Sequence, residues 1–457
     1  MKTFGIDAID YYIPPISLPI EELANARKIE AAKLEFGLGL KQMSVPDVDE
    51  DTASMAANAL LQLIQNNNID PRKIGRIYLG TESGLDASKP SATYAVGAVE
   101  EKLKNKYGER CFKNCDVVDL TFACIGAVDA LQNCLDWVKN GDKRKAIVLA
   151  SDVAKYELNS PGEYTQGAGA IALLINENPS ILEVKDQWGI AMESVGDFFK
   201  PRRLIKNKDL KNIKINDFIN SEKEEIEIYF EEPVFDGYYS NECYENRVTE
   251  ALEHFKSISK INYLKDWDHL IFHLPYAFHG RRMILDLWMN WLKENNLFST
   301  LEDEIGYYTK EDKSTWRKSA AKSSLFKTFI KNKIKSGEKA SSMIGNMYTA
   351  SIFMSLLSFL IESAKNDLKI ENKYIGFLSY GSGSKSKIFQ GQIQKKWKSK
   401  INHLSLFKDI DNRASIDFIT YEKLHNKSIK EPICKKETIS LKSVEVKENK
   451  SGYRIYN

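Results

Sequence analysis

The chain has 457 residues, of which 43% are hydrophobic and 28% are charged, and its formal net charge is +2. This composition is typical of a folded globular protein with room for two or three units of ordinary domain size, and it excludes a disordered chain. The near-neutral charge gives no overall field that would attract nucleic acid or a membrane surface, so we expect neither as a partner. No secretory segment is recognisable at the start, and six cysteines then indicate reduced thiols in a cytoplasmic protein.

Strand-like and helix-like segments alternate along the chain, which favours an α/β fold. The hydrophobic pattern predicts, in chain order, a helix over 55–65, strands over 74–80 and 115–120, a helix over 127–137, and strands over 145–152, 171–174, 270–272 and 374–378. A shift in composition near Pro179 predicts two parts, 1–180 and 181–457, and the Lys-, Asn- and Glu-rich stretch 202–233 predicts a polar surface insertion in the second. The longest apolar helical run, 352–361, is too short to span a bilayer.

Cys124 lies where the predicted strand 115–120 gives way to the predicted helix 127–137. A helix N-terminus favours negative charge, so this position predicts a thiol whose pKa is lowered and whose thiolate is available as a nucleophile. The alternative is a small, inert core residue, which is a common environment for free cysteine.

Two further side chains follow predicted strands directly. Glu82 comes after the strand that ends at Gly80, and His273 follows the apolar run Leu270–Phe272. Ligands of α/β proteins bind outside the carboxyl ends of strands, so both are candidates for general acid–base work. The alternatives are a solvated loop carboxylate for Glu82 and a hydrogen-bonded core histidine for His273.

Two glycine-containing segments suggest different roles. The segment 165–170 leads into a strand instead of opening a helix, so it indicates close backbone packing and not a nucleotide-binding loop. The segment 381–384 follows a strand, and its amides could bind an oxyanion or a thioester carbonyl. The alternative is an ordinary flexible turn.

No cysteine or histidine spacing supports a metal. Cys111 and Cys115 have three residues between them, but no second Cys or His pair follows at zinc-finger spacing, so we expect no metal site. Lysine and arginine cluster at 310–339 and at 395–400, and the tail after 427 is rich in lysine. Such clusters are usually solvated faces, and the alternative is contact with coenzyme phosphates or an acidic carrier domain.

Taken together, the segments resemble the hydroxymethylglutaryl-CoA synthase family of thiolase-like condensing enzymes. The resemblance extends from Gly5 to about Gly383 and is interrupted mainly by the insertion. Its motifs lie at 80–83, 123–124, 151–156, 165–170, 197–201, 236–240, 272–276, 344–349 and 379–383.

The resemblance implies a five-layer αβαβα fold built from two similar halves, normally in a homodimer. It implies that Cys124 takes an acetyl group from acetyl-CoA, that Glu82 removes a proton from the acetyl methyl, and that His273 holds and polarises the acetoacetyl thioester. It also implies no cofactor beyond the substrates. The supporting positions near the acyl groups are Tyr156, Thr165, Asn346 and Ser382.

Two positions depart from the family pattern. Ile125 follows the nucleophile where the family usually has Tyr, and Phe278 stands where it generally has a Lys associated with coenzyme A. Arg281 and Arg282 remain nearby as possible contacts of the coenzyme phosphates. The leading hypothesis is condensation of acetyl-CoA with acetoacetyl-CoA for mevalonate and isoprenoid synthesis. The alternatives are the same chemistry on a β-ketoacyl chain bound to an acyl carrier protein, and an inactive scaffold of the same fold.

Overall fold

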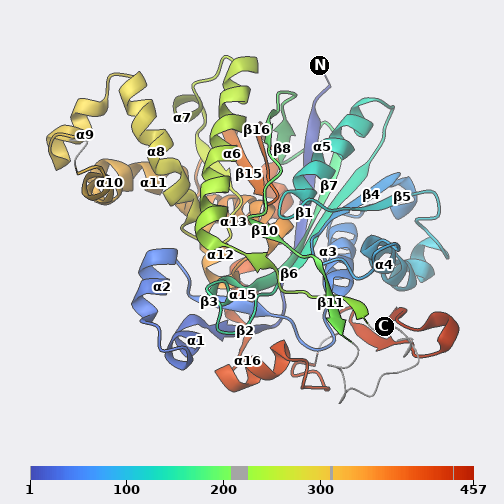
Figure 1. Ribbon diagram of the computed structural model, residues 1–457. Helices are drawn as coiled ribbons and strands as arrows, with labels where there is room; N and C mark the ends of the chain where they lie inside the picture. The colour runs from blue at the N-terminus through green and yellow to red at the C-terminus, as the bar shows by residue number, and fades with distance from the viewer. Residues whose placement is uncertain (1, 207–224, 309–311, 436) are drawn as a thin grey trace.

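The computed structural model describes residues 2–206, 225–308, 312–435 and 437–457. Within these residues the centre of the molecule is a ten-stranded sheet, drawn in Figure 1, in the order β14-β15-β16-β8-β1-β7-β6-β4-β5, with β9 paired to β16. Its strands are β1 (Phe4–Tyr12), β4 (Arg76–Gly80), β5 (Asp116–Leu120), β6 (Ala146–Ala154), β7 (Gly167–Glu177), β8 (Leu182–Val184), β9 (Gly189–Met192), β14 (His269–Phe272), β15 (Tyr374–Gly381) and β16 (Lys385–Ile393).

The strands from the first 180 residues form one end of this sheet. β4 runs parallel to both β5 and β6, whereas β6, β7 and β1 pair antiparallel. Successive side chains of β6 enter different cores because strand side chains alternate between faces. Ile147 and Leu149 pack with α3 (Thr52–Asn66) and α4 (Ser91–Tyr107), whereas Val148 packs on the other face with α5 (Gly126–Lys139).

The remaining strands continue the sheet through β8, which pairs with both β1 and β16. β14 and β15 are parallel, and β15 and β16 are antiparallel. Two helices flank this end of the sheet, α6 (Gly237–Ile258) and α13 (Ser351–Lys365), and α6 stands in front of β15 and β16 in Figure 1.

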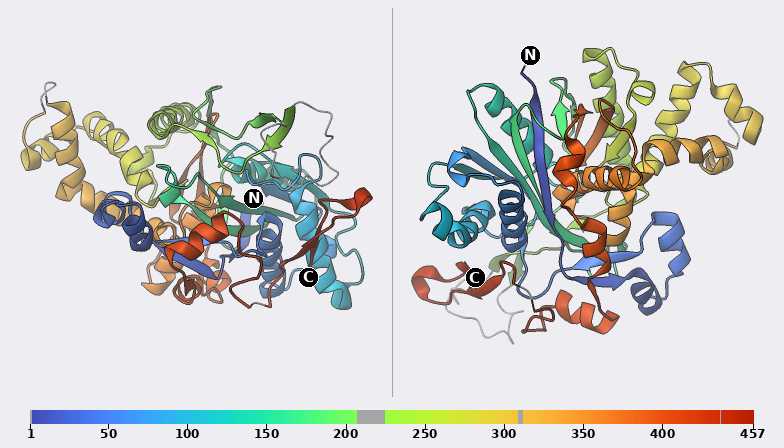
Figure 2. Two further views of the ribbon diagram at one scale, coloured as in Figure 1. Left: turned by 60° about the horizontal axis from the view of Figure 1, so that its bottom comes forward. Right: turned by 180° about the vertical axis from the view of Figure 1, so that it is seen from behind.

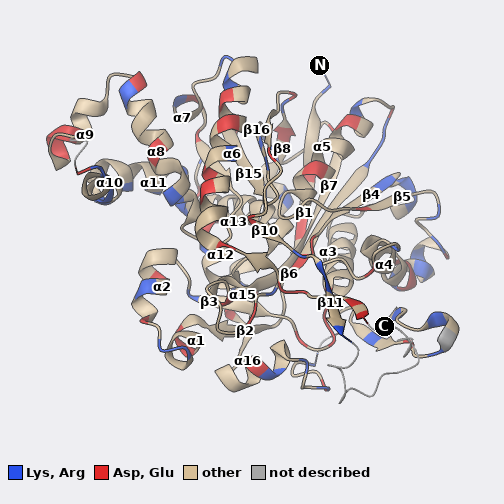
Figure 3. Ribbon diagram, in the orientation of Figure 1, with Lys and Arg blue, Asp and Glu red and all other residues tan. Residues whose placement is uncertain are grey.

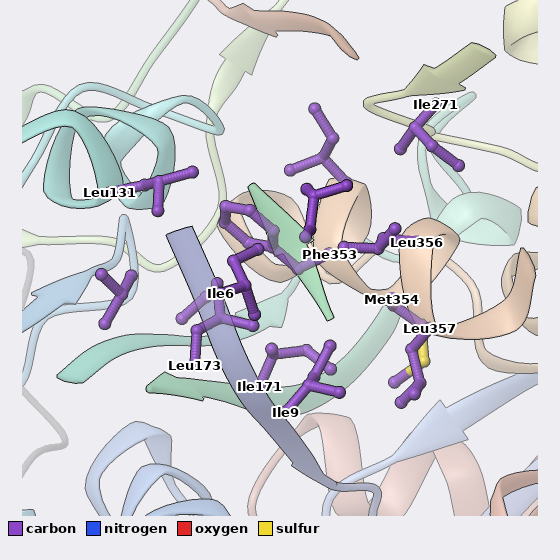
Figure 4. Close-up of a cluster of buried hydrophobic side chains, with 14 of the residues drawn as sticks. Ile6, Ile9, Leu131, Ile171, Leu173, Ile271, Phe353, Met354, Leu356 and Leu357 are labelled. Atoms are coloured by element: carbon purple, nitrogen blue, oxygen red, sulfur yellow. The ribbon is translucent and has the colours of Figure 1, made fainter. Parts of the chain in front are cut away.

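The largest core lies between α5, α13 and the sheet. Phe353, Met354 and Leu357 of α13 are fully buried there with Ile6 of β1 and Ile171 of β7, as the close-up in Figure 4 shows. Residues from both ends of the sheet therefore share one apolar layer. The result is the five-layer thiolase-like α/β fold predicted from the sequence.

The other elements surround this centre. The helices α8 to α11 project to one side of the sheet, and α16 lies at the end of the molecule that also carries β2 and β3 (Figures 1 and 2). The helices are α1 (Ile20–Ala26), α2 (Ala31–Leu38), α7 (Tyr263–Asp266), α8 (His279–Glu294), α9 (Phe298–Ile305), α10 (Lys313–Lys322), α11 (Ser324–Lys333), α12 (Lys335–Ile344), α14 (Trp397–Ile401), α15 (Leu406–Asp411) and α16 (Phe418–His425). The strands are β2 (Ile16–Pro19), β3 (Gln42–Val45), β10 (Phe198–Phe199), β11 (Arg202–Lys206), β12 (Glu225–Tyr229), β13 (Val234–Phe235), β17 (Ala414–Ser415), β18 (Leu441–Val444) and β19 (Arg454–Tyr456).

The predicted elements correspond to α3, β4, β5, α5, β6, β7, β14 and β15, with small changes at their ends. The glycine-containing segment 165–170 was predicted to precede a strand, but its last four residues, 167–170, already belong to β7. A Cβ at Gly167 would lie 2.5 Å from the carbonyl oxygen of Ile344, so close backbone packing is confirmed there. The ends of the polar insertion form the β11–β12 hairpin, and 207–224 lie outside the described residues.

Positions of Lys and Arg and of Asp and Glu alternate along the helices and strands drawn in Figure 3. The two lysine-rich clusters lie on α10 to α12, apart from 309–311 outside the described residues, and on α14. No helix in the described ranges combines the length and apolar character that crossing a membrane requires.

Candidate active site

Glu82 and Cys124 meet at the carboxyl ends of two neighbouring parallel strands. Glu82 follows β4 directly, and Cys124 lies between β5 and α5. The chain turns sharply before the cysteine, with Ala123 in the left-handed region at φ +40°. The turn presents the Cys124 Sγ 2.9 Å from the Glu82 Oε1, a hydrogen-bond distance between a thiol and a carboxylate.

The expected lowered pKa of the Cys124 thiol is wrong. Burial and the neighbouring Glu82 carboxylate raise the pKa of Cys124 well above its ordinary value. The thiol is therefore protonated at rest and donates its hydrogen bond to Glu82, and the α5 N-terminus does not outweigh these two effects. Burial also raises the pKa of Glu82 to about 7. A carboxyl of this pKa is half ionised near neutral pH, as a general base should be, so Glu82 is not a solvated loop carboxylate.

Asp152 fixes the backbone around this pair. This fully buried carboxylate at the end of β6 accepts hydrogen bonds from Thr81 Oγ1 at 2.8 Å, from the Glu82 amide at 2.9 Å and from the Thr349 amide at 3.0 Å. Asp152 was not singled out from the sequence. The available signal was its position, a charged residue within an otherwise apolar predicted strand.

Aromatic side chains enclose the sulfur. Tyr156, Phe198 and Tyr348 form a buried cluster against which Cys124 packs. The ring of Tyr348 lies 6.5 Å from that of Tyr156 and 5.9 Å from that of Phe198, in edge-to-face geometry. The Tyr348 hydroxyl is buried without a hydrogen-bond partner among the described residues. Tyr348 was not singled out from the sequence, although it lies within one of the matching motifs, 344–349.

His273 lies directly after β14, as predicted, and is buried. Its Nδ1 has no hydrogen-bond partner within the described part of the chain, so it is not a hydrogen-bonded core histidine. Burial lowers the pKa of His273 to about 3, so its imidazole is neutral. The Tyr244 ring of α6 stacks 6.3 Å from the imidazole, and the Tyr244 Oη donates to the His273 carbonyl at 2.9 Å. Burial raises the pKa of Tyr244 well above its ordinary value, and the nearby Cys124 adds to this effect.

Three of the predicted supporting residues have defined surroundings. The Asn346 amide donates to the Thr165 carbonyl at 2.9 Å, so these two buried positions lie side by side. The Asn346 Oδ1 accepts from the Tyr348 amide at 2.8 Å, which connects Asn346 to the aromatic cluster. Ser382 lies in the turn after β15, where the neighbouring Gly383 amide donates to the buried Asp197 at 2.8 Å.

A large pocket opens onto this centre. It has a volume of about 1330 Å³, and its lining includes Glu82, Ala123 next to Cys124, Phe198 and Ser382. The far wall comes from the C-terminal part of the chain, with Tyr421, His425 and Arg454. This volume exceeds that of most small-molecule sites, so a long, flexible ligand has room to reach the sulfur.

The two candidate phosphate contacts lie elsewhere. Arg281 forms a two-pronged ion pair with the buried Glu338 at 2.5 and 2.6 Å, and its guanidinium stacks 3.8 Å from the centroid of Phe278. Arg282 donates to the Gly37 carbonyl at 2.9 Å. Neither arginine lines the pocket. Their contact with coenzyme phosphates therefore stays a prediction.

Ile125, the other departure, is fully buried in the main core and contributes no polar group beside the sulfur. In the described ranges, no group of three or more His, Cys, Asp or Glu side chains is arranged to hold a metal ion. Cys111, Cys115, Cys124, Cys134 and Cys243 are free thiols.

The fold and the paired thiol and carboxylate define an acyl-condensing enzyme of the thiolase-like class. Two family models match the chain, hydroxymethylglutaryl-coenzyme A synthase N terminal over residues 1–180 and hydroxymethylglutaryl-coenzyme A synthase C terminal over residues 216–450. The chain belongs to the hydroxymethylglutaryl-CoA synthase family.

Individual relatives agree with this assignment. The chain is 29% identical to the hydroxymethylglutaryl-CoA synthase of Haloferax volcanii over 440 residues, which cover 93% of this chain and 92% of that protein. It is 30% identical to the Saccharomyces cerevisiae enzyme over 441 residues, covering 91% and 79%. Among solved structures, MvaS in complex with 3-hydroxy-3-methylglutaryl coenzyme A superposes with a TM-score of 0.80 at 27% identity, covering 100% of this chain and 99% of the other.

Proposed function

We propose that the protein condenses acetyl-CoA with acetoacetyl-CoA and water to give 3-hydroxy-3-methylglutaryl-CoA and free CoA. The observation that carries this proposal is the 2.9 Å contact between the Cys124 thiol and the carboxylate of Glu82, which lines a pocket of about 1330 Å³. The chemistry needs a nucleophile and a base within reach of the same acetyl group, and this pair supplies both.

In the first step, the Cys124 thiol transfers its proton to Glu82 and the sulfur attacks the acetyl-CoA carbonyl. Collapse of the tetrahedral adduct breaks the bond to the coenzyme sulfur, which leaves as free CoA with the proton from Glu82. The acetyl group is then covalently bound to Cys124, next to the base, and a bimolecular encounter has become an intramolecular one.

In the second step, the Glu82 carboxylate removes a proton from the acetyl methyl, and the resulting enolate attacks the ketone of acetoacetyl-CoA. The proton held by Glu82 passes to the new tertiary alkoxide. The neutral His273 imidazole is suited to donate a hydrogen bond to the acceptor's thioester carbonyl. Water then hydrolyses the Cys124 thioester and releases the product. The scheme needs no metal or redox cofactor, and the mevalonate pathway is the metabolic setting that the family implies.

Acetylation and condensation can be tested separately. Mixing the protein with acetyl-CoA alone should add one acetyl group to the Cys124 peptide in mass spectrometry, and acetoacetyl-CoA should then discharge it. Glu82→Ala should still become acetylated, although more slowly, and should fail to condense. The inactive-scaffold alternative gains support if Cys124 gains no acetyl group, and a condensing Glu82→Ala enzyme would show that the base is misassigned.

A carrier-bound acceptor is the second candidate. Phe278 occupies the first turn before α8, and Arg281 is bound to Glu338, so the start of α8 offers a nucleotide fewer cations than the family pattern implies. An acyl carrier protein presents only a phosphopantetheine arm, which has no nucleotide and needs no such cations. Turnover of acetoacetyl-CoA compared with acetoacetyl-carrier protein separates the two, and efficient use of the free coenzyme thioester eliminates the carrier.

A homodimer in the cytoplasm remains the expected setting. The support is the family membership for the dimer, and the composition for the compartment. Light scattering of the purified protein measures the first, and fractionation of the source cells measures the second.

A further inference from the structure

Lys200 lies beside the catalytic pair and has no role in the scheme above. It follows β10, and its Nζ donates to the Glu82 carbonyl at 3.1 Å. The same ammonium lies 4.9 Å from the centroid of the Tyr348 ring, and Lys200 lines the pocket. Its charge is therefore held next to the reacting groups from two sides.

The groups around this ammonium are otherwise neutral or acidic. They are Glu82, Cys124 and Tyr348, which come from the segments after β4 and β5 and from the turn before α13. Lys155 provides a contrast at the pocket rim, because its ammonium is paired with Glu231 at 2.8 Å and with Glu232 at 3.2 Å. Among the ion pairs of the described residues, none neutralises Lys200 in this way. Its charge is thus available to the catalytic pair.

We propose that Lys200 is a positioning residue whose ammonium retains one negative charge on the Cys124–Glu82 pair. The inference rests on the proposed function, because it assigns a reason for Lys200 to lie beside that nucleophile and that base. When a proton moves from the Cys124 Sγ to the Glu82 carboxylate, one negative charge is present before and after the transfer. A cation beside both groups stabilises either form, whereas burial alone favours the pair with both groups protonated.

The expected effect is large enough to measure. Lys200 opposes the effect of burial on Glu82, whose pKa is about 7, so about half of the carboxyl is ionised at pH 7. A nearby opposite charge usually lowers a carboxyl pKa by about one to three units. Loss of even about one unit would leave roughly a tenth of Glu82 ionised at pH 7, which is about a fivefold loss of reactive pairs. The loss should be recovered at higher pH.

The test uses iodoacetamide, which needs no substrate. The rate of Cys124 alkylation is followed by peptide mass spectrometry from pH 5 to pH 10 in the wild type, Lys200→Met, Lys200→Gln and Lys200→Arg. Gln can still donate an amide hydrogen bond to the Glu82 carbonyl but carries no charge, so it separates the two contacts of Lys200. We expect Met and Gln to shift the alkylation profile to higher pH by about one unit or more, and Arg to restore most of it.

The matched control is Lys293→Met. Lys293 lies 4.6 Å from the Phe298 ring centroid, outside the pocket, so the variant removes a comparable lysine–aromatic contact. Superposable profiles of the wild type and Lys200→Met would overturn the proposal, and so would a Lys200→Gln profile like the wild type. If Lys200→Met does not fold, the more conservative Lys200→Gln decides.

Condensation assays keep this test apart from the proposed function. If the Lys200 variants shift the pH profile of Cys124 alkylation but the wild type does not condense acetoacetyl-CoA, the role of Lys200 is supported and the proposed function is refuted. If the wild type condenses acetoacetyl-CoA but the Lys200 variants leave the alkylation profile unchanged, the proposed function stands and the role of Lys200 is refuted.

Discussion

Replacing Glu82 by Gln should stabilise the folded protein above neutral pH while removing condensation. Burial raises the pKa of Glu82 from 4.5 to about 7, so the folded protein binds this proton more tightly than the unfolded chain does. The stabilisation from the bound proton is fully present below pH 4.5 and is lost as the pH rises through about 7. The difference between the two pKa values corresponds to about 3 kcal/mol of unfolding free energy.

Gln has nearly the same shape as protonated Glu and does not ionise. The Glu82→Gln protein should therefore be more stable than the wild type by about 3 kcal/mol at pH 8 and by less than about 1 kcal/mol at pH 5. Urea denaturation at both pH values measures the difference directly. Glu431→Gln, on an exposed loop, is the control, and its difference from the wild type should not change between the two pH values.

A difference between Glu82→Gln and the wild type that is equal at pH 5 and pH 8 would refute this reasoning. It would mean that the carboxyl is solvated in the folded protein, and the case for Glu82 as a base near neutral pH would fail with it. The predicted direction, greater stability with lower activity, is the usual compromise at a site that buries an ionisable group for chemistry.

Three further variants test other parts of the site. His273→Ala should still acetylate Cys124 but lose about 100-fold in kcat/KM for acetoacetyl-CoA, because one donor to the acceptor is gone; unchanged steady-state kinetics would contradict its role. Asp152→Ala should lower the free energy of unfolding by about 2–4 kcal/mol in urea denaturation, since it leaves buried donors unpaired; a cost below about 0.5 kcal/mol would show that the site relaxes around the loss. Arg281→Ala should cost about 3–5 kcal/mol because Glu338 is buried, and adding Glu338→Gln should recover most of it; a raised KM for acetyl-CoA with unchanged stability would instead make Arg281 a coenzyme contact.

The sequence sufficed to predict features that depend on neighbours along the chain. Strand ends can be recognised from hydrophobic patterns, and in parallel strands these ends lie at one edge of a sheet. Glu82 and Cys124 follow β4 and β5, which are parallel, so their meeting was predictable in outline. The same reasoning placed His273 after β14, next to β15.

Features that depend on contacts far apart in the chain were not predictable in this way. The pKa of Cys124 was predicted in the wrong direction because the local effect, a helix N-terminus, is visible in the sequence, whereas burial and the Glu82 carboxylate 42 positions away are not. Arg281 was expected as a possible contact of the coenzyme phosphates, and its partner Glu338, 57 positions further on, is not visible in the local sequence. Lys200 lies 118 positions from Glu82, and nothing in the local pattern links the two.

The burial of α13 has a consequence for how the chain folds as it is synthesised. Ile6, Ile9 and Ile171 belong to the first 180 residues, yet they are covered by Phe353 and other residues of α13. A ribosome that has completed β7 still has to translate residues 178–350, more than a third of the chain, before α13 begins. During that interval the nascent protein exposes an apolar sheet face, and such surfaces are prone to aggregation. The N-terminal part is therefore expected to need either chaperone protection or rapid completion of the chain before it reaches its final packing.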